Sequence, residues 1–243
     1  MIKLFTLLLL LPFLSFGQET KKITDKDTHE VYYVLKSNKS VRQGNYQKNN
    51  YTGRIVVNGY YKNGLKDSTW TEYYWNGITL KSQGSYSNDL RIGIWEFYDD
   101  KGVLIQKYDY TKKELVFFQP DENEDGKKYK VIEGSDTIET VLDRPPLYLG
   151  GFGAMMDVFG KSARYPGEAR EKGVSGRVVV SFIIGNDGKP SNYHIVKSVG
   201  YGCDEEAIRV IMLLRDNWIA AVVNGKAVSV EYIMPFNFTL SNE

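Results

Sequence analysis

Few side chains in this sequence have the types and spacing that catalysis or metal binding requires. The chain has two histidines, His29 and His194, and neither has a recognisable serine or cysteine nucleophile motif around it. Two histidines also provide no cluster of metal ligands. The acidic run at 121–125 (DENED) could attract a cation loosely, but it lacks the regular ligand spacing of a calcium loop. We therefore predict that the protein is not an enzyme and holds no metal.

A glycine-rich stretch at 150–160 (GGFGAMMDVFG) has the composition of a nucleotide-binding loop. No strand pattern leads into it and no Gly-Lys-Ser/Thr follows, so a phosphate cradle is not expected. The glycines are better explained by a tight entry of the chain into a domain. We predict no cofactor.

The residues at 228–240 (VSVEYIMPFNFTL) can offer a different kind of chemistry, that of the peptide backbone. Apolar and polar side chains alternate along this stretch, which predicts a strand with one buried face. Pro235 lacks an N–H group, so the strand is expected at the edge of its sheet. An edge strand presents unpaired backbone groups to any extended peptide.

The elements that must position this strand can be read from the preceding residues. Residues 153–163 have apolar side chains at helical spacing, and Tyr165-Pro166 opens a second short helix. The apolar, β-branched run at 177–184 predicts a strand, which a turn joins to a second strand at 192–198. Acidic residues from Asp204 onward predict the start of a helix. The apolar stripe of that helix is expected to contain Ala207, Ile211, Leu214 and Trp218.

The first half of the chain contains an internal repeat. Residues 59–80 align with residues 84–105 at an offset of 25, and the shared positions include Trp70 with Trp95. Aromatic and polar residues alternate on both sides of Asn-Gly turns, which predicts β-hairpins stacked into a ribbon. The aromatic ladder is expected to serve cross-strand packing, with an aromatic binding surface as the alternative. Residues 128–141 could form one more hairpin after the acidic turn.

The N-terminal residues and the overall charge indicate where the protein acts and which partners it has. Lys3 precedes an apolar run from Leu4 to Phe16, which is typical of a signal peptide and shorter than the roughly 20 residues of a membrane-spanning helix. We predict a cleaved signal peptide and a periplasmic location; an inner-membrane anchor facing the periplasm is the alternative. The formal net charge of +1 argues against a nucleic-acid partner. Cys203 is the only cysteine and is expected to be a small buried residue beside a helix start.

The last 100 residues resemble the C-terminal domain of TonB-type energy transducers. The residues that carry this resemblance are the PPLYLGGFGAMMDVFGKSARYP stretch, CDEEAIRV, Trp218 and the final strand. The resemblance implies helices on an antiparallel sheet and a last strand that takes up a short segment of an outer-membrane transporter. The partner-binding residues that it implies are Val228, Val230, Tyr232, Met234, Phe236 and Phe238 on the strand, with Arg164, Tyr165, Pro166 and Arg170 nearby.

Residues 41–118 resemble MORN-like repeats of the kind found in the YwqK family of putative antitoxins. The predicted fold class is thus α+β, a hairpin-repeat ribbon followed by a TonB-like domain. The expected divisions are 1–17 (signal peptide), 18–40 (N-terminal segment), 41–118 (repeats), 119–142 (linker and hairpin) and 143–243 (TonB-like domain). The predicted function is capture of transporter segments by strand addition, linked to transport across the envelope. Inner-membrane motor proteins would be further partners if the leader is retained. The alternative is a scaffold or toxin-neutralising protein that binds through its repeats.

Overall fold

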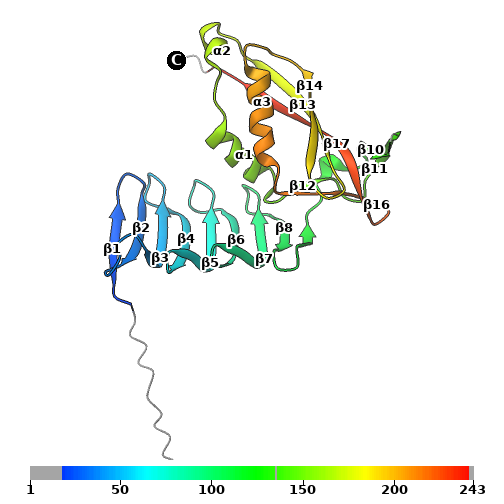
Figure 1. The fold of residues 1–243 in the computed structure, drawn as a ribbon. Coiled ribbons are helices and arrows are strands. Elements are labelled where there is room, and N and C mark those ends of the chain that lie inside the picture. The colour runs from blue at the N-terminus through cyan, green and yellow to red at the C-terminus, as the bar shows by residue number, and fades with distance from the viewer. Residues whose placement is uncertain (1–17, 135, 241–243) are drawn as a thin grey trace, which may run out of the picture.

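The computed structural model describes residues 18–134 and 136–240, and these form two bodies that contact each other. A row of antiparallel strands makes the first body, and a helix-covered sheet makes the second (Figure 1). The predicted signal peptide lies outside the described residues. Within them, no helix is long and apolar enough to cross a membrane.

The first body is a nine-stranded sheet in which each strand pairs with its neighbours in sequence. We call it the repeat sheet. Its strands are β1 (Thr20–Asp25), β2 (Glu30–Leu35), β3 (Arg42–Asn49), β4 (Ile55–Lys62), β5 (Leu65–Tyr73), β6 (Leu80–Ser87), β7 (Leu90–Tyr98), β8 (Leu104–Asp109) and β9 (Glu114–Phe118). The segment 18–40 supplies β1 and β2, so the sheet begins before the first recognisable repeat.

Tryptophan rings that pack on glycines explain the offset of 25 residues. Trp70 and Trp95 are 1% and 0% exposed. A Cβ atom on Gly59 would lie 2.2 Å from the Trp70 ring, and one on Gly84 would lie 2.3 Å from the Trp95 ring. Only glycine leaves room for the ring on the neighbouring strand, so each repeat must keep both residues. These two tryptophans therefore serve cross-strand packing.

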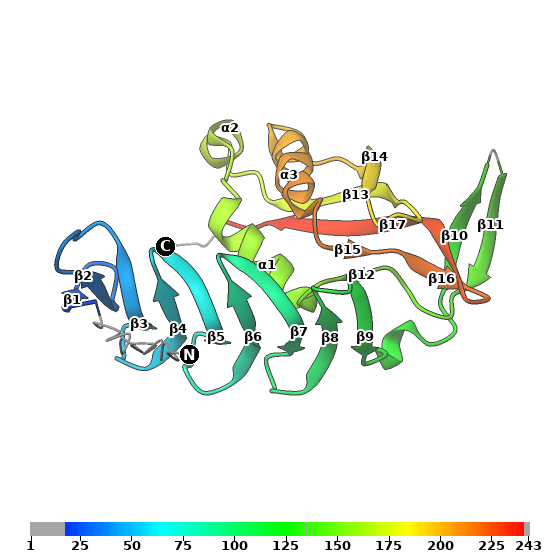
Figure 2. The ribbon, with the colours of Figure 1, turned by 60° about the horizontal axis from the view of Figure 1, so that its bottom comes forward.

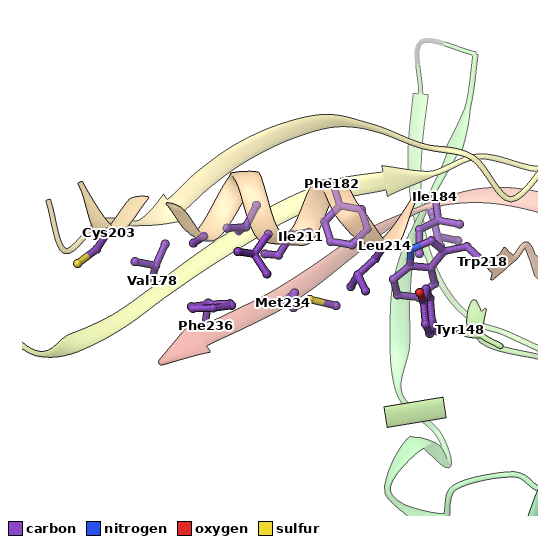
Figure 3. Close-up of a cluster of buried hydrophobic side chains, with 14 of the residues drawn as sticks. Tyr148, Val178, Phe182, Ile184, Cys203, Ile211, Leu214, Trp218, Met234 and Phe236 are labelled. Atoms are coloured by element: carbon purple, nitrogen blue, oxygen red, sulfur yellow. The ribbon is translucent and has the colours of Figure 1, made fainter. Parts of the chain in front are cut away.

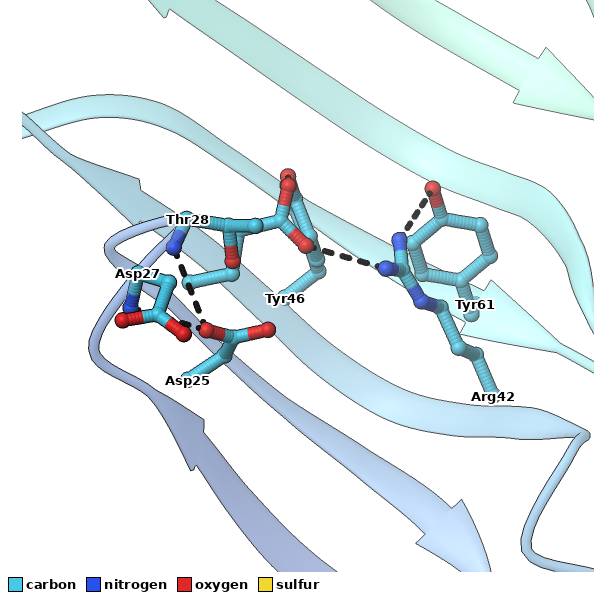
Figure 4. Close-up of polar contacts among 7 residues, drawn as sticks. Asp25, Asp27, Thr28, Arg42, Tyr46 and Tyr61 are labelled. Atoms are coloured by element: carbon cyan, nitrogen blue, oxygen red, sulfur yellow. Dashed lines mark hydrogen bonds and ion pairs between the residues drawn. The ribbon is translucent and has the colours of Figure 1, made fainter.

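Polar contacts lock the same face of the sheet near its N-terminal end (Figure 4). The Arg42 guanidinium donates hydrogen bonds to Glu30 Oε2 at 2.9 Å and to Tyr61 Oη at 3.3 Å. Tyr46 Oη donates to the other carboxylate oxygen of Glu30 at 2.9 Å. Burial and this bond raise the pKa of Tyr46. The hydroxyls of Tyr46 and Tyr61 are thus engaged within the sheet.

The second body, which we call the C-terminal body, comprises helices on an antiparallel sheet, as predicted. Its main sheet has the strand order β11-β10-β17-β13-β14, with β16 also paired to β17. Its elements are η1 (Glu122–Glu124), β10 (Lys128–Glu133), β11 (Asp136–Val141), β12 (Leu147–Tyr148), α1 (Gly151–Ser162), α2 (Gly167–Glu171), β13 (Gly176–Ile184), β14 (Pro190–Lys197), α3 (Cys203–Ile211), η2 (Met212–Leu214), β15 (Trp218–Ile219), β16 (Ala221–Val223) and β17 (Lys226–Phe238). The predicted hairpin at 128–141 is present as β10 and β11.

The core of this body lies between α3 and the sheet (Figure 3). The predicted helix after Asp204 ends at Ile211, so the expectation that Trp218 continues its stripe is wrong. Trp218 instead lies in β15, pairs with Tyr148 and contacts the rings of Phe182 and Tyr232. It joins the same core by a different path, because a tight turn redirects the chain after Leu214. Cys203 is fully buried at the start of α3, as expected.

Candidate partner-binding groove

The last strand, β17, pairs with β16 and then β10 along its first part, and with β13 from Val230 to its end. Val228 pairs with Ala221 of β16, and Val230 pairs with Val131 of β10. The prediction of an edge strand is therefore wrong for this first part, because β16 and the hairpin at 128–141 pair with it there. From Glu231 to Phe238, β13 pairs with one side of β17. Among the described residues, no strand pairs with the other side, which we call the open edge.

The predicted alternation of β17 is confirmed, and it decides what each side chain can do. Val230, Met234, Phe236 and Phe238 are 0–8% exposed and belong to the core. Tyr232 is only partly buried, and its ring contacts Phe182 at 5.6 Å between centroids. These side chains hold the strand in place. What the open edge can present to a partner is its backbone and the outward-facing side chains.

A groove of about 600 Å³ runs between the open edge and helix α1. Figure 2 shows α1 lying between β17 and the repeat sheet. Phe152 and Met156 of α1 are 69% and 39% exposed, and Ile233 of β17 is 54% exposed. All three line the groove. Sequence reasoning missed them, although Phe152 and Met156 are spaced by one helical turn.

The structure brings two of the four predicted residues around α2 to this groove. Arg164 and Tyr165 line it, and the Tyr165 ring contacts Phe238 at 5.7 Å between centroids. Pro166 and Arg170 are not among its lining residues. The Tyr165 hydroxyl donates to the Val174 carbonyl at 2.5 Å, so this residue is already held within the domain.

The end of the groove near Arg164 is fixed by the neighbouring helix α3. The Arg164 backbone N–H donates to Glu206 Oε1 at 2.6 Å. Hydrogen bonding from Arg209 holds the pKa of Glu206 below its ordinary value. Arg209 also donates to the carbonyl of Ser162, the last residue of α1. The backbone at Ser162 and Arg164 is thus held in place by α3, while the Arg164 side chain is exposed.

The repeat sheet holds the other end of α1 through the buried side chain of Gln106. Gln106 is 4% exposed; its Nε2 donates to the Tyr148 carbonyl at 3.0 Å, and its Oε1 accepts from Gly150 N–H at 2.8 Å. Gly150 has φ of 85°, and a Cβ there would lie 2.7 Å from the Ala154 Cβ. The glycine-rich stretch thus provides the tight chain entry expected of it.

Two further contacts fix α1 on the repeat sheet. Lys81 of β6 forms an ion pair with Asp157 of α1. Gly153 lies against Tyr74, where an added Cβ would be 2.6 Å from the hydroxyl oxygen. Burial, with nearby carboxylates, raises the pKa of Tyr74 to about 12. Helix α1, which forms one wall of the groove, is therefore held by residues of the repeat sheet.

The described residues contain no group of three or more histidine, cysteine or acidic side chains placed to hold a metal ion. What the site offers is an open strand edge beside apolar side chains. Such a site suits an extended peptide, whose backbone can pair with the edge while its side chains enter the groove.

Residues 161–240 match the family model described as Gram-negative bacterial TonB protein C-terminal. No curated protein and no solved structure matches the chain. The matched segment contains the open edge and the Arg164 end of the groove, and its family points to a TonB-like envelope protein. Residues 161–240 are thus similar to the C-terminal domain of TonB proteins.

Proposed function

We propose that the C-terminal body captures an extended segment of an outer-membrane transporter by adding it as a strand to the open edge of β17. The protein would act from the periplasm, after export and cleavage of residues 1–17, in support of transport across the envelope. The observation that carries this proposal is the open edge from Glu231 to Phe238 beside an apolar groove.

The position of Pro235 supports capture by backbone pairing. On the β13 side a proline would cost a ladder hydrogen bond, so we expect its nitrogen to face the open side. Alternate residues of a strand direct their backbone N–H and C=O groups to the same side. The backbone groups of Glu231, Ile233 and Asn237 would therefore face the open side as well. These four residues offer three N–H groups and four carbonyls, because Pro235 lacks an N–H.

The groove is needed because backbone pairing alone gives too little affinity. About five hydrogen bonds contribute about 0.5–1.5 kcal/mol each, whereas association costs roughly 4–15 kcal/mol. Burying an exposed apolar side chain contributes about 1.5–3 kcal/mol. Phe152, Met156 and Ile233 are 39–69% exposed, so each can gain part of this from a partner side chain. We therefore expect captured segments to place apolar residues toward α1.

The test is binding of synthetic peptides copied from periplasmic N-terminal segments of outer-membrane transporters of the same organism. In Ile233→Pro the edge loses an N–H group but keeps its β13 ladder, so affinity should fall about two- to tenfold. Ile233→Thr keeps the N–H group and a β-branched side chain, and serves as the matched control. Equal binding by the proline variant and the control would refute strand addition. Tyr232 is a poor choice for this test, because its ring packs in the core.

A further inference from the structure

The groove does not end at Tyr232 but opens there into a larger cavity between the two bodies. This interbody cavity has a volume of about 800 Å³. Phe152, Met155 and Tyr232 line both the groove and the cavity. A segment that leaves the open edge at Glu231 would therefore pass directly into the cavity.

Both bodies supply walls of the interbody cavity. The repeat sheet contributes Gln106 of β8 and Phe118 of β9. The C-terminal body contributes the stretch Pro145–Tyr148, with Trp218 behind it. Phe152, at 69% exposure, stands where the groove meets the cavity. The cavity thus has apolar walls that a long side chain can follow.

The charge of the interbody cavity has one sign. Its lining includes five carboxylate residues and no lysine or arginine, and the five are Asp121, Glu122, Glu124, Asp125 and Asp143. Glu124 already pairs with Lys127 at 2.8 Å, and Asp143 accepts a hydrogen bond from Gly225 N–H at 3.1 Å. The exposed carboxylates of Glu122 and Asp125 remain at the turn that closes the cavity. Lys127 offsets the charge of Glu124, so a further cation at this place would be attracted mainly by Glu122 and Asp125.

We propose that the captured segment is longer than the open edge and places a lysine or arginine in the interbody cavity. This inference rests on the proposed strand capture. Lysine and arginine fit because their aliphatic stems can lie on Phe152 and Phe118 while the charged end reaches the acidic turn. The repeat sheet then forms part of the partner-binding surface and sets which flanking residues a segment can carry.

The experiment uses the full chain and a set of designed peptides. Each peptide has the same eight-residue core of alternating threonine and valine, and carries a Gly-Lys-Lys, Gly-Gln-Gln or Gly-Glu-Glu tail at one end or the other. Affinities are measured by calorimetry for the native protein and for the double variant Glu122→Gln, Asp125→Asn. The native protein should bind one lysine-tailed peptide about tenfold more tightly than its glutamine-tailed counterpart. The double variant should lose most of this preference and bind the glutamine-tailed peptide as before.

Three outcomes would overturn the inference, and they separate it from the capture proposal. Equal affinity for all tails would show that the segment does not enter the cavity, while sensitivity to Ile233→Pro would still support capture. A lysine preference of equal size at both ends would indicate nonspecific charge attraction and would overturn the inference as well. Binding that Ile233→Pro does not weaken would refute edge capture itself, and the cavity proposal with it.

Discussion

Gln106→Leu tests whether one buried side chain couples the repeat sheet to the groove wall. Leucine has a similar size but cannot hydrogen bond, so the Tyr148 carbonyl and the Gly150 N–H would lose their side-chain partner at a buried site. A buried polar group left unpaired costs about 1–3 kcal/mol. Two such groups give about 2–6 kcal/mol, from which the extra apolar burial of leucine recovers about 1 kcal/mol. We expect a net loss of about 1–5 kcal/mol in the free energy of unfolding.

The matched control for this substitution is Gln43→Leu. Gln43 Oε1 also accepts a backbone hydrogen bond, from Asn63 N–H at 2.7 Å, but this bond is exposed and water can replace it. The control should lose less than about 1 kcal/mol.

Urea unfolding, followed by tryptophan fluorescence, measures the free energies, and hydrogen exchange reports on α1. In Gln106→Leu the amides of Gly151–Ser162 should exchange faster than in the control, because the helix loses its anchor. Peptide affinity should fall in the same variant. If Gln106→Leu and Gln43→Leu unfold with the same free energy and the same exchange of α1, the repeat sheet does not position the groove wall.

Two further predictions concern the repeat sheet. Gly84→Ala should destabilise the protein by about 2 kcal/mol or more, because its Cβ would overlap the Trp95 ring; Gly167→Ala, with no atom within 4 Å of its Cβ, should leave the urea midpoint nearly unchanged. Hydrogen bonding from Lys107, with Gln83, lowers the pKa of Glu96 to about 2. Since the folded pKa lies below the unfolded one, this stabilisation is present above about pH 4.5 and is lost as the pH falls toward 2. Thermal unfolding between pH 7 and pH 3 should show a loss of about 1–3 kcal/mol, and an equal loss in Glu96→Gln would contradict this assignment.

Local patterns in the sequence predicted much of this fold because the forces behind them act over short distances. The alternation along β17 follows from the two-residue period of a strand, and the structure confirms its buried face. The offset of 25 residues follows from the pairing of a glycine with a tryptophan on the next strand. The TonB resemblance likewise rests on an ordered set of local motifs, and the family model covers residues 161–240.

The neighbours of β17 could not be read from the same patterns. Val131 pairs with Val230 although 99 positions (230 minus 131) separate them in the sequence. The hairpin at 128–141 was predicted as a hairpin, but nothing in its alternation indicates which strand it joins. Its addition to β17 removes Val230 from the open edge, the pairing with β16 removes Val228, and Glu231–Phe238 is left.

The position of the groove wall, α1, also could not be predicted from sequence patterns. The glycine-rich stretch that begins at Gly150 indicated a tight chain entry, but nothing in the sequence pointed to Gln106, and only their approach in space makes a buried clamp. By itself the sequence determined the strand periods, the repeat and the TonB-like segment, because hydrophobic periodicity and turn chemistry are local properties. Only the tertiary structure decided which part of β17 stays open and which surfaces face it, because pairing and packing between distant segments depend on the whole fold.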